Sequence, residues 1–101
     1  MKYKDHVHLS IYHILYLTNL KVYYIQKYDK ETYIIEWEQT FDEIERIDLS
    51  QNNKLFLKLS KKGIENQSVG WFSSAIVVRE IESEKNDLKE IVLKLNEFKD
   101  I

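Results

Sequence analysis

The side chains best suited to metal chemistry are two histidines near the N-terminus, His6 and His8. Alternate residues of a strand point to the same side, so the two imidazoles share one face. Two imidazole nitrogens are only half of a tetrahedral zinc site. His13 has the opposite parity, and no third ligand accompanies the pair. The pattern therefore favours a polar outer face, and we predict no metal site.

Catalysis requires a nucleophile beside a base, or paired carboxylates in a cleft. Asp42, Glu43 and Glu45 form the densest acidic cluster, but a solvated turn explains them. The only glycines are Gly63 and Gly70, which excludes a glycine-rich phosphate loop. The chain also contains no cysteine. We predict no catalytic residue, no cofactor and no enzyme activity.

The sequence contains one basic group that is suited to anionic lipid. Near an acidic bilayer, each lysine contributes about 1 kcal/mol of binding free energy. The alternative is an ordinary solvated face that also protects a sheet edge from pairing. The predicted lipid-binding residues are Lys54, Lys58, Lys61 and Lys62.

Exposed aromatic side chains on a sheet or a loop are typical of protein contacts. Trp71 and Phe72 follow Gly70 in a polar segment, where two large rings either return to the core or insert into a partner. Tyr23 belongs to a tyrosine-rich strand, where such rings also stabilise the sheet by pairing across strands. We predict partner binding by Trp71, Phe72 and Tyr23.

The elements that position these residues are short strands followed by one helix. Alternating apolar residues predict a long strand over 6–17, and strands over 21–28 and 32–38 complete a meander. In the third strand, the alternation places Tyr33, Ile35 and Trp37 on one face. A turn or bulge then leads to the remaining strands, over 45–49, 55–59, 69–72 and 75–81, with a polar loop over 61–70.

The last segment changes to helical spacing. Ser83 is a good N-cap residue, and the predicted helix spans 83–99. Leu93 falls outside its apolar stripe. The stripe is too apolar for water, so the helix must cover the sheets. It consists of Leu88, Ile91, Val92, Leu95 and Phe98.

Length and composition predict a single domain over residues 1–101. The net charge of −2 comes from 15 basic and 17 acidic side chains that are well mixed, which argues against a nucleic-acid partner. No apolar run approaches the roughly 18 residues of a membrane span, and the N-terminus lacks the apolar core of a signal peptide. We therefore expect a cytoplasmic protein, peripheral at membranes.

Seven meandering strands and a C-terminal helix resemble the pleckstrin homology (PH) superfold. The segment from Ile14 to Ile25 is similar to the strand–turn–strand opening of such domains. The chain also resembles the C-terminal PH-like domain of chorein-type (vacuolar protein sorting 13) bridge lipid-transfer proteins. The residues that carry this likeness are Ile34-Ile35-Glu36-Trp37, Phe41-Asp42-Glu43-Ile44 and Ile47.

The resemblance implies a mainly β fold, a seven-stranded antiparallel sandwich or half-open barrel capped by a helix. It also implies a targeting module that binds a small GTPase or an adaptor protein, with weak anionic-lipid contact, within a larger membrane-trafficking protein. Phosphoinositide-binding PH domains carry several basic residues at the turn after their first strand, whereas that turn here offers only Lys21. The alternative function is a small standalone protein–protein interaction domain without lipid binding.

Overall fold

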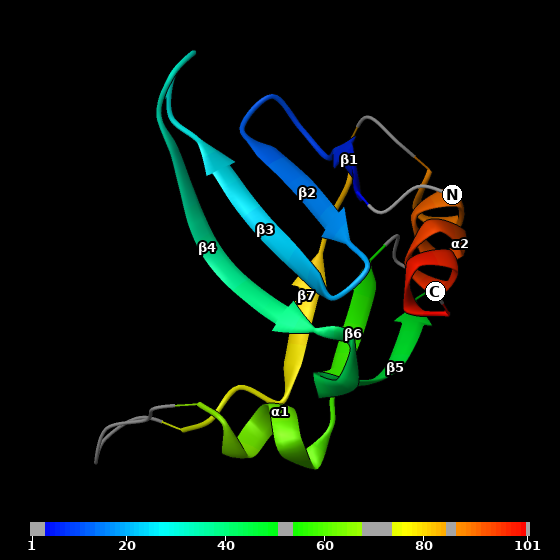
Figure 1. Cartoon of the computed structure of the whole chain (residues 1–101). Coiled ribbons are helices and arrows are strands. Elements are labelled where there is room, and N and C mark those ends of the chain that lie inside the picture. The colour runs from blue at the N-terminus through cyan, green and yellow to red at the C-terminus, as the bar shows by residue number, and fades with distance from the viewer. Residues whose placement is uncertain (1–3, 51–53, 68–73, 85–86, 101) are drawn as a thin grey trace.

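The computed structural model describes residues 4–50, 54–67, 74–84 and 87–100. These residues form two antiparallel sheets and a C-terminal helix, arranged as a sandwich (Figure 1). The larger sheet has the order β1-β2-β3-β4, and the smaller has the order β5-β6-β7. The sheets do not close into a barrel. The predicted mainly β sandwich with one C-terminal helix is therefore confirmed.

The larger sheet is a four-stranded meander. Its strands are β1 (Lys4–His8), β2 (His13–Thr18), β3 (Lys21–Lys27) and β4 (Tyr33–Thr40). The predicted single strand over 6–17 is wrong, because the chain turns back between β1 and β2. Ser10 Oγ stabilises that turn by accepting hydrogen bonds from the backbone N–H groups of Tyr12 (3.2 Å) and His13 (3.1 Å).

The alternation of apolar and polar residues continues through this turn and therefore gives no sign of it. In the β1–β2 pair, Val7 lies opposite Leu15 and Asp5 opposite Leu17, so partners always have the same parity. Odd-numbered residues therefore face inward on both strands, and period two continues unbroken through the hairpin. The turn after the first strand is thus 9–12, which contains no lysine or arginine, and Lys21 is the first residue of β3, directly after the second turn.

A β-bulge in β4 separates residues that simple alternation groups together. Tyr24 pairs with Trp37, but the next residue of β3, Ile25, pairs with Ile35. Glu36 is therefore the extra residue, and Ile35 and Trp37 face opposite sides of the sheet. The prediction that Tyr33, Ile35 and Trp37 share one face is wrong for Trp37, which faces inward.

The chain reaches the smaller sheet through a short 3₁₀ helix, η1 (Phe41–Glu43). The strands that follow are β5 (Ile44–Leu49), β6 (Leu55–Leu59) and β7 (Val78–Ile81). The predicted strand over 75–81 is thus shorter, and the predicted strand over 69–72 lies outside the described residues. Within the predicted loop 61–70, Lys61–Glu65 form the helix α1, whose N-cap Ser60 accepts from Gly63 N at 3.2 Å.

The helix α2 (Leu88–Lys99) covers the core, as predicted, but begins later than expected. Its N-cap is Asp87, whose carboxylate accepts a hydrogen bond from Lys89 N at 2.9 Å. Ser83 precedes the helix, because the backbone N–H of Glu84 donates to Leu9 O (2.7 Å) and holds this segment beside the β1–β2 turn. Leu93 is 70% exposed, outside the buried stripe as predicted.

The core lies between the inner faces of the two sheets and α2. It combines Leu15, Leu17 and Val22 of the larger sheet with side chains of β6 and α2. Leu55, Leu57 and Leu59 of β6 all face inward, as their alternation predicts. Ion pairing between Lys94 of α2 and Asp5 of β1 (2.8 Å) fixes the helix against the N-terminal strand.

Candidate docking surface

The four predicted lipid-binding lysines lie on β6, its flank and α1, and each is paired with a carboxylate. Lys54 contacts Glu80 (2.9 Å) and Glu82 (3.5 Å), and Lys58 contacts Glu45 (3.6 Å). Lys61 pairs with Glu65 (3.9 Å), and Lys62 pairs with Asp42. Hydrogen bonding to these acids raises the pKa of Lys54 and of Lys62. Each of the four lysines therefore has an acidic partner that locally neutralises its charge.

The predicted partner-binding residues divide into two groups. Trp71 and Phe72 lie outside the described residues. Tyr23 is described and lies on the outer face of the larger sheet, opposite in parity to the buried Val22. Its ring packs edge-to-face on Tyr16 with centroids 6.1 Å apart, and Lys21 Nζ lies 6.0 Å from its centroid.

The neighbours of Tyr23 extend into a continuous surface, which we call the outer face. The register sets two rows across all four strands, His6–Tyr16–Tyr23–Glu38 and His8–Ile14–Ile25–Ile35. Ile35 is 54% exposed and ends the second row on the edge strand β4, beside Ile25. The smaller sheet and α2 pack on the inner side of the larger sheet.

The rim of the outer face is polar and mixed in charge. His6 and His8 are exposed along β1, and their rings meet edge-to-face with centroids 5.2 Å apart. On the opposite side, Lys21 and Glu38 form an ion pair at 3.7 Å. Aromatic and aliphatic residues surrounded by polar ones are the composition of a protein–protein interface. Tyr23 is among the predicted partner-binding residues, whereas Ile35 is not, because the face on which Ile35 lies depends on the bulge.

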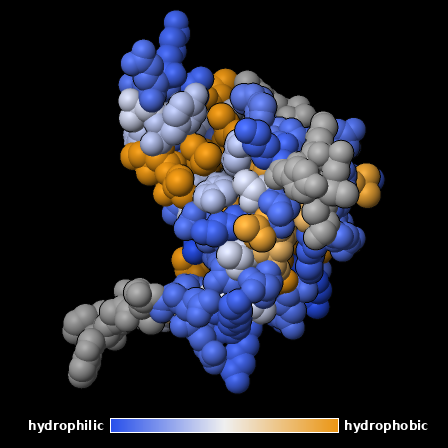
Figure 2. Space-filling model, viewed as in Figure 1, coloured by the Kyte–Doolittle hydropathy of each residue, from blue (hydrophilic) through white to orange (hydrophobic). Residues whose placement is uncertain are grey.

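One edge of β4 adds further apolar surface. Tyr33 is 50% and Ile34 is 45% exposed, and β4 is the last strand of its sheet. Figure 2 shows this hydrophobic surface on the first half of β4, below the hydrophilic tip of the β3–β4 hairpin. An edge strand with exposed apolar side chains is a ready template for contact with another chain.

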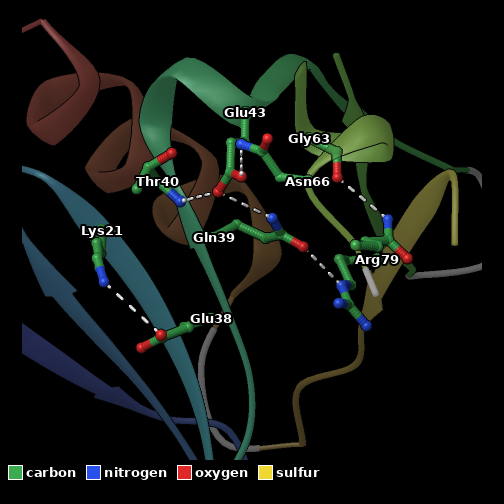
Figure 3. Close-up of a pocket in the computed structure, with 9 residues that line it drawn as sticks. Lys21, Glu38, Gln39, Thr40, Glu43, Gly63, Asn66 and Arg79 are labelled. Carbon is green, nitrogen blue, oxygen red and sulfur yellow. Dashed lines mark hydrogen bonds and ion pairs between the residues drawn. The ribbon is translucent and has the colours of Figure 1, made fainter. Parts of the chain in front are cut away.

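A network of polar side chains fixes the end of β4 to the smaller sheet, around a hollow of about 210 Å³ (Figure 3). Glu43 is its centre and accepts from Thr40 N (2.9 Å), Gln39 Nε2 (3.3 Å) and Asn66 Nδ2 (3.1 Å). The buried Gln39 in turn accepts from Arg79 Nε at 3.0 Å. The network ties β4, α1 and β7 together and so holds the larger sheet in place.

Arg79 also begins a stack of rings along the inner face. Its guanidinium lies 5.2 Å from the Trp37 centroid. Trp37 stacks on Tyr24 at 5.2 Å, and Tyr24 stacks on His13 at 5.1 Å. Burial lowers the pKa of Arg79. The stack therefore runs from β7 across β4 and β3 to β2 along the inner face of the larger sheet.

The Glu43 network should make stability depend on pH. Burial works to raise the pKa of Glu43, but hydrogen bonds from Thr40, Asn66 and Gln39 outweigh it and lower the pKa below 4.5. A lowered folded-state pKa contributes stability above the unfolded pKa, which is lost as pH falls through the folded pKa. We expect Glu43→Gln to be less stable than the unsubstituted chain at pH 7, with the difference shrinking towards pH 3.

Urea unfolding at a series of pH values measures this difference. The matched control is Glu97→Gln, an exposed site on α2 with the same change in charge. A Glu43→Gln deficit that stays constant between pH 7 and pH 3 would contradict the expectation. Part of the pH dependence of the free energy of unfolding should persist in the Glu43→Gln variant, because hydrogen bonds also lower the pKa values of Asp29 and Asp42.

Two further findings concern metal ions and membrane-spanning helices. Among the described residues, no group of three or more histidine and acidic side chains is arranged to hold a metal ion. Within the same part of the chain, no helix is long and apolar enough to cross a membrane.

Comparison with known proteins agrees with the resemblance seen in the residues. No curated protein and no solved structure matches the chain. A family described as "Intermembrane lipid transfer protein VPS13, C-terminal" matches residues 1–95. The match covers nearly the whole chain, and therefore all seven of the strands that the structure describes and most of α2. The chain belongs to the family of VPS13 C-terminal domains of intermembrane lipid transfer proteins.

Proposed function

We propose that this domain is a non-enzymatic targeting module of a lipid-transfer protein, and that it recruits a protein partner through the outer face of the larger sheet. The observation that carries the proposal is the apolar centre formed by the half-buried Tyr16 and Tyr23 and by the exposed Ile35, with its polar rim. Such a centre excludes water on binding, while the rim sets orientation. The resemblance to PH-like domains favours a small GTPase or an adaptor as the partner.

Replacing Ile35 with lysine should weaken partner binding at least about tenfold, because it places an unpaired charge in the apolar centre. Ile35 is 54% exposed, so the fold should tolerate the change. The measurement is calorimetric titration with partners identified by pull-down from cytosol. Small GTPases are tested in both nucleotide states.

The matched control is Leu93→Lys, the same chemical change at a residue of α2 that is 70% exposed. It should bind like the unsubstituted chain. Equal affinity of the Ile35→Lys and Leu93→Lys variants would remove the outer face as the docking surface.

The lysine group should add a weak, salt-sensitive lipid contact, which places the domain at membrane surfaces. Because all four lysines are already paired with carboxylates, their attraction to a bilayer is reduced below the usual ~1 kcal/mol each. We expect sedimentation with phosphatidylserine vesicles at low salt and loss of sedimentation at high salt.

Replacing Lys54, Lys58, Lys61 and Lys62 together with glutamine should abolish this sedimentation. A matched control replaces Lys4, Lys27, Lys30 and Lys99, which lie on other elements or turns, and should retain it. If the unsubstituted chain stays in solution at low salt, the lipid contact is wrong and the module binds protein alone.

A further inference from the structure

A second hollow, of about 350 Å³, lies on the inner side of the larger sheet, at the end where the β1–β2 turn approaches the chain that leaves β7. We call it the mouth hollow. It is lined by Ser10, Ile11, Tyr12, His13, Tyr24, Glu82 and Glu84. Neither Tyr23 nor Ile35 lines it, so it is a separate site from the outer face.

Apolar side chains form one wall of the mouth hollow. Ile11 is 63% and Tyr12 is 58% exposed, although both lie in a turn whose neighbour Leu9 is completely buried. The side chains of lysine and arginine pack their aliphatic stems on such surfaces and keep their charged heads outside.

Carboxylates form another part of the lining. Glu82 and Glu84 line the hollow, and Glu36 lies beside His13, 3.8 Å from its Nε2. The only lysine that contacts Glu82 within the described residues is Lys54, whose shorter ion pair is with Glu80. The pKa of Tyr24 is raised by burial and by the charges of Glu36 and Glu82, which agrees with a negative potential here.

The walls are held in place before any ligand arrives. The backbone N–H of Glu84 donates to Leu9 O (2.7 Å), which links the acidic segment to the turn. Lys27 N donates to Tyr12 O (2.7 Å), and His13 stacks on Tyr24. A preformed site loses less conformational entropy on binding.

We propose that the mouth hollow receives a lysine or arginine side chain from an extended segment of the protein partner, with the stem on Ile11 and Tyr12 and the head at Glu82 and Glu84. Charge complementarity selects this occupant, because a carboxylate pair beside an apolar wall matches a cation on an apolar stem. A bare metal ion does not need the apolar wall, and no metal-ligand group is found among the described residues. The inference rests on the proposed function only in assuming a protein partner.

The test uses the whole chain and two synthetic peptides that alternate valine with lysine or with glutamine. In NMR titrations, the lysine peptide should shift the amide signals of residues 10–13 and 82–84, and the glutamine peptide should not. The variant Glu82→Gln/Glu84→Gln should weaken lysine-peptide binding about tenfold. The control Glu31→Gln/Glu97→Gln, with the same change in net charge, should stay within about twofold.

Three results would overturn the inference. These are equal binding of both peptides, no shift at residues 10–13 and 82–84, and equal weakening by the two double variants. Phosphatidylcholine vesicles form a separate arm, because binding that needs Glu82 and Glu84 would identify a lipid headgroup cation as the occupant instead. Each peptide and vesicle titration is repeated with the Ile35→Lys variant, in which the outer face should no longer dock a partner. Peptide binding unchanged by that substitution separates the mouth hollow from the proposed partner docking.

Discussion

Replacing Phe98 with alanine should lower the free energy of unfolding by about 3–5 kcal/mol. Phe98 is 1% exposed and is among the largest fully buried side chains of the core. Removing its ring forfeits the transfer free energy of the ring and leaves a cavity that the two sheets cannot close, because their strands are fixed by backbone pairing. Urea unfolding followed by circular dichroism measures the loss.

The matched control for this prediction is Leu93→Ala on the same helix. Leu93 is 70% exposed, so its truncation should change stability by no more than about 0.5 kcal/mol. If the two variants lose similar stability, the helix contributes through its own propensity and not by packing. The assignment of α2 as the cover of the sandwich would then be wrong.

The helix is the element that the sequence predicted best, and the reason is physical. Five apolar residues at helical spacing have only one way to leave water, and four of them, Leu88, Ile91, Leu95 and Phe98, are buried. Its start was less predictable, because Ser83 and Asp87 are both good caps. The position of Asp87 was the better indicator of where the helix begins, since Asp87 directly precedes the first residue of the apolar stripe.

The first strand shows where alternation fails as a signal. A hairpin whose partners share parity keeps the same residues inward on both sides of the turn, so the pattern carries no mark of the reversal. Only Ser10, a residue that bonds readily to nearby backbone N–H groups, indicated a turn. The helix α1 was missed for the opposite reason, since its five residues are too few to show a period.

The residue types of the candidate site could be predicted from the sequence, but the contacts between its side chains could not. A residue type is a local property, whereas a cross-strand contact depends on residues far away in the chain. Tyr23 was identified from its type and its strand. The bulge that brings Ile35 to the same face depends on register between strands, which no single strand records. The sequence predicts the four lysines as an outward-facing group, but it does not predict their acidic partners, which come from η1, β5, β7 and α1.

Gly63→Ala should destabilise the joint between the two sheets, even though alanine is the better helix former. A Cβ atom at Gly63 would lie 2.6 Å from the backbone oxygen of Glu43 and 3.0 Å from its Cβ. That oxygen already accepts a hydrogen bond from Ser60 N at 2.8 Å, so it cannot retreat without weakening this bond. Overpacking of this kind costs about 1–3 kcal/mol, more than the ~1 kcal/mol that alanine gains over glycine in a helix.

The loss of stability in Gly63→Ala should exceed the cost of the local clash alone, because Glu43 is the centre of the network that joins β4 to α1. Displacing its backbone also misplaces the carboxylate that accepts from Thr40 and Asn66. The control is Glu65→Ala, an exposed residue on the same helix that should change stability by less than about 0.5 kcal/mol. Thermal unfolding distinguishes the two, and a Gly63→Ala variant more stable than Glu65→Ala would show that α1 does not pack closely on η1.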